Sequence, residues 1–266
     1  MAELIKSYLN FCNYRRHLEE KGKIDLTNRR WFYPTELLPL GDLLYSLDKK
    51  FYKLPVNPHV KNYFILMTDQ SSSKGLSYIP IHRVHRFTEE DDNDIYDLIV
   101  KKCKTDQKNP FKLLIAELTT NVNEHSQCSN SSFMAQRYNK NGFVEMVFFD
   151  NGITIPGSLR NSGKDDGKSD ANLIVKAING LSSKSDERGF GLQESIRIIT
   201  VGCGGEVFIV SGSGAFYTNK EKITPPYREI VGKAFKLDSY QELNGTLISF
   251  VLPLPIPDKI NLDGIL

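Results

Sequence analysis

Apolar positions change their spacing along the chain, and each spacing predicts a local structure. Residues 24–26 read as a short strand, and the leucines of residues 35–47 recur on one face of a helix, with Thr35 placed to cap it. The continuous apolar run at residues 63–67 predicts a buried strand, and the polar residues 70–75 predict a loop. This alternation indicates a small α/β segment in the first part of the chain.

The middle of the chain predicts two helices and a hairpin. Residues 88–103 open with a threonine and an acidic run and then place apolar residues on one face, as an amphipathic helix does. A further helix is expected over residues 111–126, after the breaker Pro110. Two apolar runs, residues 133–138 and 143–149, are separated by a segment that ends in Asn-Gly, a strong hairpin signal.

Residues 157–188 have a different character from their surroundings. They are rich in Gly, Ser, Lys and Asp around one helical stretch at residues 171–178, and this composition fits a mobile segment better than core. Strand character returns at residues 206–210, 215–218 and 246–252, and the sequence shows no internal repeat.

Composition and charge narrow the classes of protein. With 266 residues, of which 40% are hydrophobic, the chain can bury a sizeable core, so disorder is not expected. The 34 basic and 32 acidic residues leave a net charge of +2, which is too small to favour nucleic acid or an anionic membrane as a partner through long-range electrostatics. Only a local basic patch would remain compatible with such partners.

The cysteines and the hydropathy point to a reducing, aqueous environment. Cys12, Cys103, Cys128 and Cys203 form no CxxC pair and have no histidine at zinc spacing, so neither a metal site nor a disulfide framework is expected. No stretch approaches the ~20 apolar residues of a membrane span. We therefore expect a soluble, cytoplasmic protein.

The first candidate motif lies on the helix expected over residues 111–126. Glu117 and Asn121 are four residues apart, so they share one face of that helix. A carboxylate can orient or deprotonate a hydroxyl or water, and an amide oxygen can bind a hard cation such as Mg²⁺. The alternative is a solvated polar stripe on a surface helix.

The second motif is an apolar strand that ends in Asp150 and is followed by Asn151 and Gly152. A strand end presents the carboxylate rigidly, and the glycine lets a ligand approach the backbone closely. The carboxylate could accept a hydrogen bond from an adenine amino group. Taken alone, the segment is better interpreted as a strand followed by an Asn-Gly turn.

The third motif is a glycine pair, Gly189 and Gly191, in front of an apolar-periodic helix that runs to about residue 199. Backbone amides at a helix N-terminus bind phosphate, and Lys184 or Arg188 could add positive charge. The pair lacks the context of a Rossmann or Walker motif and is weak evidence alone. Thr246 follows a turn that opens the last strand, and by itself that turn carries no function.

The order of these four features resembles the N, G1, G2 and G3 boxes of the GHKL ATPases, a family that includes gyrase B, Hsp90, MutL, histidine kinases and anti-sigma-factor serine kinases. The resemblance implies a Bergerat-type ATP-binding fold, a two-layer α/β sandwich with helices on one face of a mixed sheet. It divides the chain into an N-terminal α/β segment, residues 1–87, and an ATP-binding domain, residues 88–266. The core motifs would span residues 111–253, and a mobile lid would cover about residues 157–188.

The resemblance also implies a role for each singled-out residue in binding ATP and Mg²⁺. Glu117 would be the general base, Asn121 the magnesium ligand and Asp150 the carboxylate that recognises adenine. The remaining nucleotide contacts would come from Gly152, Lys184, Arg188, Gly189, Gly191 and Thr246.

Three positions depart from the family pattern or lie beside it. Thr154 stands where the G1 box usually has a second glycine, which predicts a stiffer or differently shaped lid hinge. Asn123 is a second polar neighbour of the site, and His125 is interpreted as a structural residue at the helix end.

Within the family, the chain looks most like the anti-sigma-factor kinases. The upstream histidines lie outside any dimerisation helix that a histidine kinase would need, and no long transducer region follows the last strand. Residues 24–40 are also similar to the strand, turn and helix around the phosphoacceptor of STAS domains, the partners of those kinases, with Thr35 near the acceptor position. Ordinary packing, with the aromatic residues 31–33 in a core, is the alternative.

Two functions remain open at this stage. The first is a Mg-ATP enzyme that hydrolyses ATP or phosphorylates Ser/Thr on a partner protein as a regulatory switch. The second is a non-catalytic module whose interaction with a regulatory protein is gated by nucleotide. Homodimerisation is common among similar proteins, but the sequence shows no clear interface, no membrane signal and no clear nucleic-acid signal.

Overall fold

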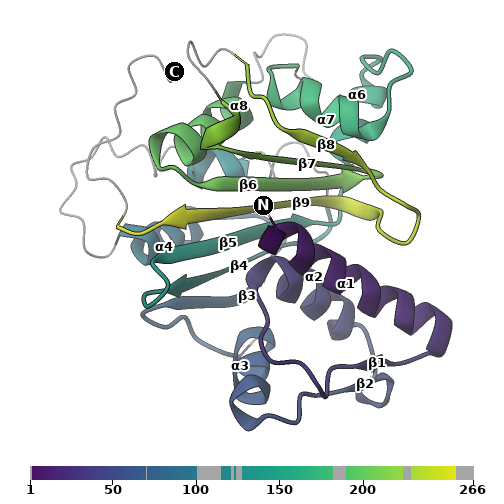
Figure 1. Ribbon diagram of the computed structural model, residues 1–266, viewed down its shortest axis with the longest axis vertical. Coiled ribbons are helices and arrows are strands. Elements are labelled where there is room, and N and C mark those ends of the chain that lie inside the picture. The colour runs from purple at the N-terminus through teal and green to yellow at the C-terminus, as the bar shows by residue number, and fades with distance from the viewer. Residues whose placement is uncertain are drawn as a thin grey trace.

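The structure is a computed structural model that describes residues 2–69, 71–100, 115–120, 123, 128–181, 190–223 and 229–255. Its centre is a seven-stranded sheet with the order β3-β4-β5-β9-β6-β7-β8 (Figure 1). The strands are β3 (Tyr78–Val84), β4 (Ser131–Tyr138), β5 (Phe143–Asp150), β6 (Glu206–Gly212), β7 (Gly214–Asn219), β8 (Lys233–Lys236) and β9 (Leu243–Pro253).

The class is α/β, as predicted, but the expectation of a mixed sheet is wrong. Every pair of neighbouring strands in the seven-stranded sheet is antiparallel. The hairpin expected at Asn141-Gly142 is confirmed, because β4 pairs with β5 from Ser131 and Asp150 to Tyr138 and Phe143. The predicted strands near residues 206, 215 and 246 are confirmed as β6, β7 and β9, whereas the edge strands β3 and β8 were not predicted.

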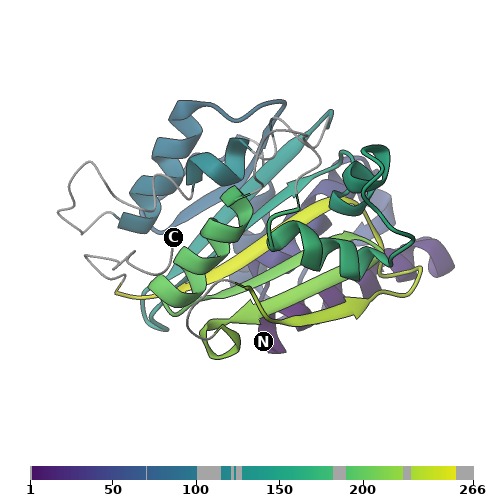
Figure 2. The ribbon, with the colours of Figure 1, turned by 90° about the horizontal axis from the view of Figure 1, so that it is seen from above.

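One face of the sheet is covered by helices that follow β3 in the chain. These are α4 (Glu89–Val100), a helical segment at residues 115–120, α7 (Asp170–Ile178) and α8 (Phe190–Arg197), which continues as a π-helical turn, Ile198–Gly202. Figure 2 shows α8, in green, lying over β9, in yellow, and both contribute to one apolar cluster that includes Ile196 and Phe250. The short helix α6 (Ile155–Asn161) contacts α7 and β6.

The N-terminal segment covers the opposite face and adds a third layer that the sequence did not predict. It consists of α1 (Ala2–Lys21), α2 (Pro34–Tyr45) and α3 (Pro58–Thr68), with a two-residue parallel pair β1 (Ile24–Asp25) and β2 (Tyr52–Lys53). Two short 3-10 turns complete the described elements, η1 (Lys49–Phe51) and η3 (Lys220–Lys222). Leu37 and Phe64 from this layer share an apolar cluster with Val147 and Leu247 of the sheet.

Burial on both faces explains the continuous apolar runs of the strands. Val144, Met146 and Phe148 of β5 point into the cluster beneath α4 and α8, whereas Val147 points towards the N-terminal layer. A strand buried on both sides loses the alternation of apolar and polar residues that marks a half-exposed strand. The predicted boundary between residues 87 and 88 falls after β3. Because β3 pairs with β4, the segment before this boundary contributes an edge strand to the seven-stranded sheet.

The strand expected at residues 63–67 is wrong, because these residues belong to α3. Asn57 caps this helix by accepting hydrogen bonds from the backbone N–H groups of His59 and Val60, and Pro58 occupies its first turn. Its buried residues are Val60, Phe64 and Met67, which follow helical spacing. Residues 63–67 are all apolar, including the exposed Ile65, so no polar residue marks the outer face of the helix. The run therefore resembled a buried strand.

The interpretation of residues 157–188 as a segment outside the core is wrong for the part that the structure describes. Residues 157–181 contain the end of α6, a connecting turn and all of α7, and Leu173, Ile174 and Ile178 are completely buried. Residues 182–188 lie outside the described residues. The helices expected near residues 35 and 88 are confirmed as α2 and α4, and residues 115–120 and 123 are helical within the range 111–126.

Among the described residues, no helix combines the length and the apolar character required to cross a bilayer.

Candidate functional site

Asp150 occupies the last position of β5, beside the first strand residues of β9. It is only 5% exposed, and its register partner on β9 is Thr246. The backbone N–H of Gly152 donates a 2.9 Å hydrogen bond to Asp150 Oδ1, which fixes the carboxyl group at the strand end. The strand therefore presents this carboxyl group rigidly, as the sequence pattern predicted.

Burial raises the pKa of Asp150 to about 7, and the hydrogen bond from Gly152 opposes that increase. No described basic side chain forms an ion pair with this carboxyl group. Its protonation state therefore changes near neutral pH, and a hydrogen-bond donor that reached it would favour the ionised form.

Thr246 and Ser211 form a hydroxyl pair next to Asp150. Their side-chain oxygens are 2.9 Å apart, and the backbone N–H of Ile155 donates a 2.8 Å hydrogen bond to Ser211 Oγ. The pair thus ties β9 and β6 to the start of α6. Ser211 was not singled out from the sequence, although its place at the end of an apolar strand resembles that of Asp150.

A glycine is required where β9 comes close to the end of β5. Gly245 has a φ of +113°, and a Cβ atom there would lie 1.9 Å from the carbonyl oxygen of Asp150. A side chain at this position would therefore separate the two strands just beside the Asp150 carboxyl group.

All three polar residues point to the face of the sheet that α8 covers. Asp150 follows the alternation of Val144, Met146 and Phe148, which belong to the apolar cluster under the helices of that face. Thr246 is in register with Asp150 and with Ser211, so these side chains share that face. Asp150, Thr246 and Ser211 therefore lie at the margin of this apolar cluster, near the strand ends.

Glu117 and Gly191 are brought together by two helices of the same face. A Cβ atom on Gly191 would lie 1.5 Å from Glu117 Oε1 and 2.0 Å from its Cδ, so the carboxyl group packs directly on the glycine backbone. Gly191 belongs to the first turn of α8, and Glu117 belongs to the helical segment at residues 115–120. The absence of a side chain at residue 191 is what lets the two helices place a carboxyl group at this helix start.

Thr154, the position of the missing second glycine, begins α6. Its hydroxyl accepts a 2.9 Å hydrogen bond from the N–H of Gly157, so it is the N-cap of the helix. Its φ of −62° and ψ of 154° are accessible to any residue. The backbone conformation at residue 154 therefore does not require glycine. The chain continues from β5 into α6, which Thr154 caps.

Asp170, at the start of α7, fastens the α6–α7 segment to the sheet. Its Oδ2 accepts hydrogen bonds from the N–H and the hydroxyl of Ser213, at 2.8 and 2.9 Å, and its Oδ1 pairs with Arg160. Burial acts to raise the pKa of Asp170, but the hydrogen bonds from Ser213 and the Arg160 pair outweigh it, and the pKa lies below its ordinary value. This contact joins residues 43 positions apart, so no local sequence pattern predicts it.

Several predicted site residues lie outside the described residues, namely Asn121, His125, Lys184, Arg188 and Gly189. Asn123 is described, and its side chain forms two hydrogen bonds with the backbone of Phe87. It accepts from the N–H of Phe87 at 2.9 Å and donates to the carbonyl of Phe87 at 3.1 Å. Asn123 therefore connects its helix to Phe87, two residues before α4 begins. Within the described part of the chain, no group of three or more His, Cys, Asp or Glu residues could hold a metal ion.

Thr35 does not have the roles that the sequence suggested. The N-cap of α2 is Tyr33 and Pro34 occupies its first turn, so the prediction that Thr35 caps the helix is wrong. Its side chain is completely buried, and its hydroxyl bonds to Glu145. In this fold the hydroxyl group is therefore inaccessible to a phosphorylating enzyme.

No protein-family model, no curated protein and no solved structure matches this chain.

Proposed function

We propose that the chain binds ATP with Mg²⁺ at the ends of β5 and β9, and that it hydrolyses the nucleotide or transfers its γ-phosphoryl group to Ser/Thr of a regulatory partner protein. The observation that carries the proposal is the buried Asp150 carboxyl group, held by Gly152 on the face of the sheet that α8 covers. A buried acceptor at a strand end suits the amino group of adenine, which would add a second donor to the one that Gly152 supplies.

The remaining residues supply complementary chemistry. Thr246 and Ser211 offer hydroxyl groups beside Asp150, and Gly152 carries no side chain that would keep a planar base from the backbone. Glu117 lies on the first turn of α8, where it could orient the attacking hydroxyl or water. Bound Mg²⁺ would neutralise phosphate charge, and we propose Asn121 as its ligand. Phosphate contacts would come from Lys184, Arg188, Gly189 and Gly191.

A second function is favoured by the same contact of Glu117. Because its carboxyl group packs on the backbone of Gly191, Glu117 also suits a purely structural role that holds α8 in place. The attachment of α6 and α7 to the sheet, through Ile155 with Ser211 and through Asp170 with Ser213, is consistent with slow turnover. Under this proposal ATP would bind without reacting and would gate a protein interaction.

Calorimetric titration of Mg-ATP, followed by an ADP-release assay on the same samples, separates these functions. The variants are Asp150→Asn, Glu117→Gln and, as the control, Asp238→Asn, an exposed acid outside the site. Binding that Asp150→Asn weakens, with ADP release that Glu117→Gln abolishes, supports the enzyme. Binding without ADP release supports the gated module, and failure of the folded protein to bind ATP refutes both.

A further inference from the structure

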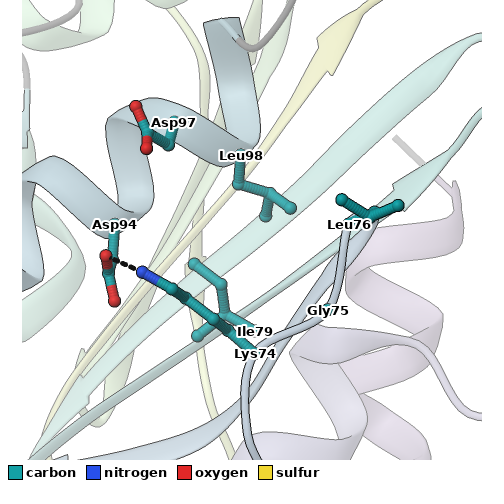
Figure 3. A pocket seen from close by; sticks show the side chains of 7 residues that line it. All are labelled: Lys74, Gly75, Leu76, Ile79, Asp94, Asp97 and Leu98. Carbon is teal, nitrogen blue, oxygen red and sulfur yellow. Dashed lines mark hydrogen bonds and ion pairs between the residues drawn. The ribbon is translucent and has the colours of Figure 1, made fainter.

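A small cavity lies at the edge of the sheet, beside β3. It has a volume of ≈ 240 Å³ and opens between α4, β3 and the loop that precedes β3 (Figure 3). Its lining residues are Lys74, Gly75, Leu76, Ile79, Asp94, Asp97 and Leu98. Pockets for drug-sized ligands typically occupy about 300–1,000 Å³, so this cavity suits one long side chain better than a nucleotide or cofactor.

The floor and the rim of the cavity are apolar. Ile79 and Leu98 are 5% and 4% exposed and form the floor, whereas Leu76 at the rim is 80% exposed. Leu76 buries little apolar surface in the folded chain. A bound partner that covered it would remove this surface from water, which favours binding. The floor can accept the aliphatic stem of a long side chain.

The wall of the cavity is acidic. Helix α4 carries Glu89, Glu90, Asp91, Asp92, Asp94 and Asp97 and has no Lys or Arg between Glu89 and Val100. Lys74 already pairs with Asp94, which shows that this wall accepts a cationic group (Figure 3). Asp97, one turn further along α4, has no ion pair with any described residue.

The guanidinium group of Arg137 contacts the backbone of α4. Arg137 donates to the carbonyl of Leu98 at 3.3 Å and to Asn139 Oδ1 at 2.9 Å, so it is engaged in hydrogen bonds to the backbone and to β4's own turn. The combination of an apolar floor, one carboxylate in an ion pair and a second carboxylate one helical turn away is complementary to a basic side chain with an apolar neighbour.

We propose that this cavity is a docking site for an arginine side chain of a partner protein. The arginine stem lies on Ile79 and Leu98, its guanidinium group pairs with Asp97, and an apolar residue next to it covers Leu76. Arginine fits better than lysine, because its planar group presents several donors to a carboxylate and is more weakly hydrated. The site is independent of the nucleotide site, so it can be tested without ATP.

The test is methyl NMR on the full-length protein without nucleotide, titrated with the peptide acetyl-Leu-Arg-Leu-amide. The matched probe replaces arginine with citrulline, which has nearly the same shape and no charge. We expect saturable shifts of the Leu76, Ile79 and Leu98 methyl signals with the arginine peptide, and affinity about fivefold weaker with citrulline, the size of a single exposed ion pair. Added salt should also weaken binding of the arginine peptide, because it screens the ion pair.

Two variants of α4 separate the cavity from the general field of the helix. Asp97→Asn should weaken binding of the arginine peptide about as much as citrulline does, whereas Glu90→Gln, which removes the same charge outside the cavity, should leave it within twofold. The proposal is overturned if the methyl signals do not shift, if both peptides bind equally, or if the two variants have equal effects.

Discussion

Thr35 on α2 donates two hydrogen bonds to Glu145 on β5, although the residues are 110 positions apart in the sequence. The backbone N–H and the hydroxyl of Thr35 contact the same oxygen, Oε1, at 2.9 and 2.7 Å. The Thr35 hydroxyl also contacts the hydroxyl of Ser249 on β9. All three residues are buried, so this polar link joins the N-terminal layer to β5 and β9, the two strands that carry Asp150 and Thr246.

Replacing Thr35 with valine tests the energetic value of this link. The change keeps the shape but removes the hydroxyl donor, which leaves the buried Glu145 with one hydrogen bond fewer. We expect the free energy of unfolding to fall by about 1–3 kcal/mol. Urea denaturation measures it, and Thr35→Ser, which keeps the hydroxyl, should cost less. A smaller loss for Thr35→Val than for Thr35→Ser would show that the methyl group contributes more than the hydrogen bond.

The buried glutamates predict an unusual dependence of stability on pH. Burial raises the pKa of Glu145 from 4.5 to about 7, against the hydrogen bonds from Thr35, and burial raises that of Glu36 to about 7 despite its pair with Arg29. The folded state then binds more protons than the unfolded state between these values. The free energy of unfolding should therefore fall as pH rises from about 4.5 to about 7, by roughly 1–3 kcal/mol per group.

The variant Glu145→Gln checks the origin of this slope. Glutamine cannot ionise and keeps an oxygen that accepts from Thr35, so unfolding curves at pH 5 and pH 8 should differ less than in the wild type. A wild-type protein that is more stable at pH 8 than at pH 5 would contradict the prediction, because the slope would then have the opposite sign.

Asp150 predicts a dependence of ATP affinity on pH. A bound adenine amino group would favour the ionised carboxylate, so ATP binding would lower the pKa from about 7 and affinity would weaken as pH falls below that value. Calorimetry between pH 5.5 and 8.5 measures this change. The same series on Asp150→Asn corrects for titration of the nucleotide phosphates, and parallel curves for the two proteins would exclude Asp150 as the titrating group.

Gly245 predicts a steep cost of substitution at the junction of β5 and β9. In Gly245→Ala the new Cβ atom would overlap the Asp150 carbonyl oxygen, and the positive φ adds strain, so the loss of stability should be about 3 kcal/mol or more. Gly163, with a φ of +71° and nothing within 4 Å of its Cβ position, is the control. Gly163→Ala should cost only about 1–2 kcal/mol in thermal or urea unfolding. Similar losses at both positions would mean that the close approach is not limiting.

Gly191→Ala tests whether the position of Glu117 matters for turnover. The added methyl group displaces a flexible carboxyl group, and alanine favours helix by about 1 kcal/mol, so the fold should be retained. If Glu117 is the base, ADP release should fall as far as in Glu117→Gln while unfolding curves hardly change. Wild-type turnover in Gly191→Ala would remove Glu117 from the mechanism.

Local patterns in the sequence determined the elements that depend on near neighbours. The hairpin at Asn141-Gly142 and the helices α2 and α4 were predicted correctly, because turn chemistry and helical periodicity act over a few residues. The same reasoning placed Asp150 at a strand end. It failed at residues 63–67, where a short apolar run fits a helix or a strand equally well.

Only the tertiary structure decided how these elements combine. The pairing of β5 with β9 buries Asp150 next to Thr246, and the packing of two helices sets Glu117 on Gly191, through contacts between residues far apart in the chain. The N-terminal layer covers the second face and buries Thr35 and Glu145, polar residues that composition alone would place at the surface. Such positions follow from the shape of the whole core, since polar groups are buried only where a distant partner satisfies them.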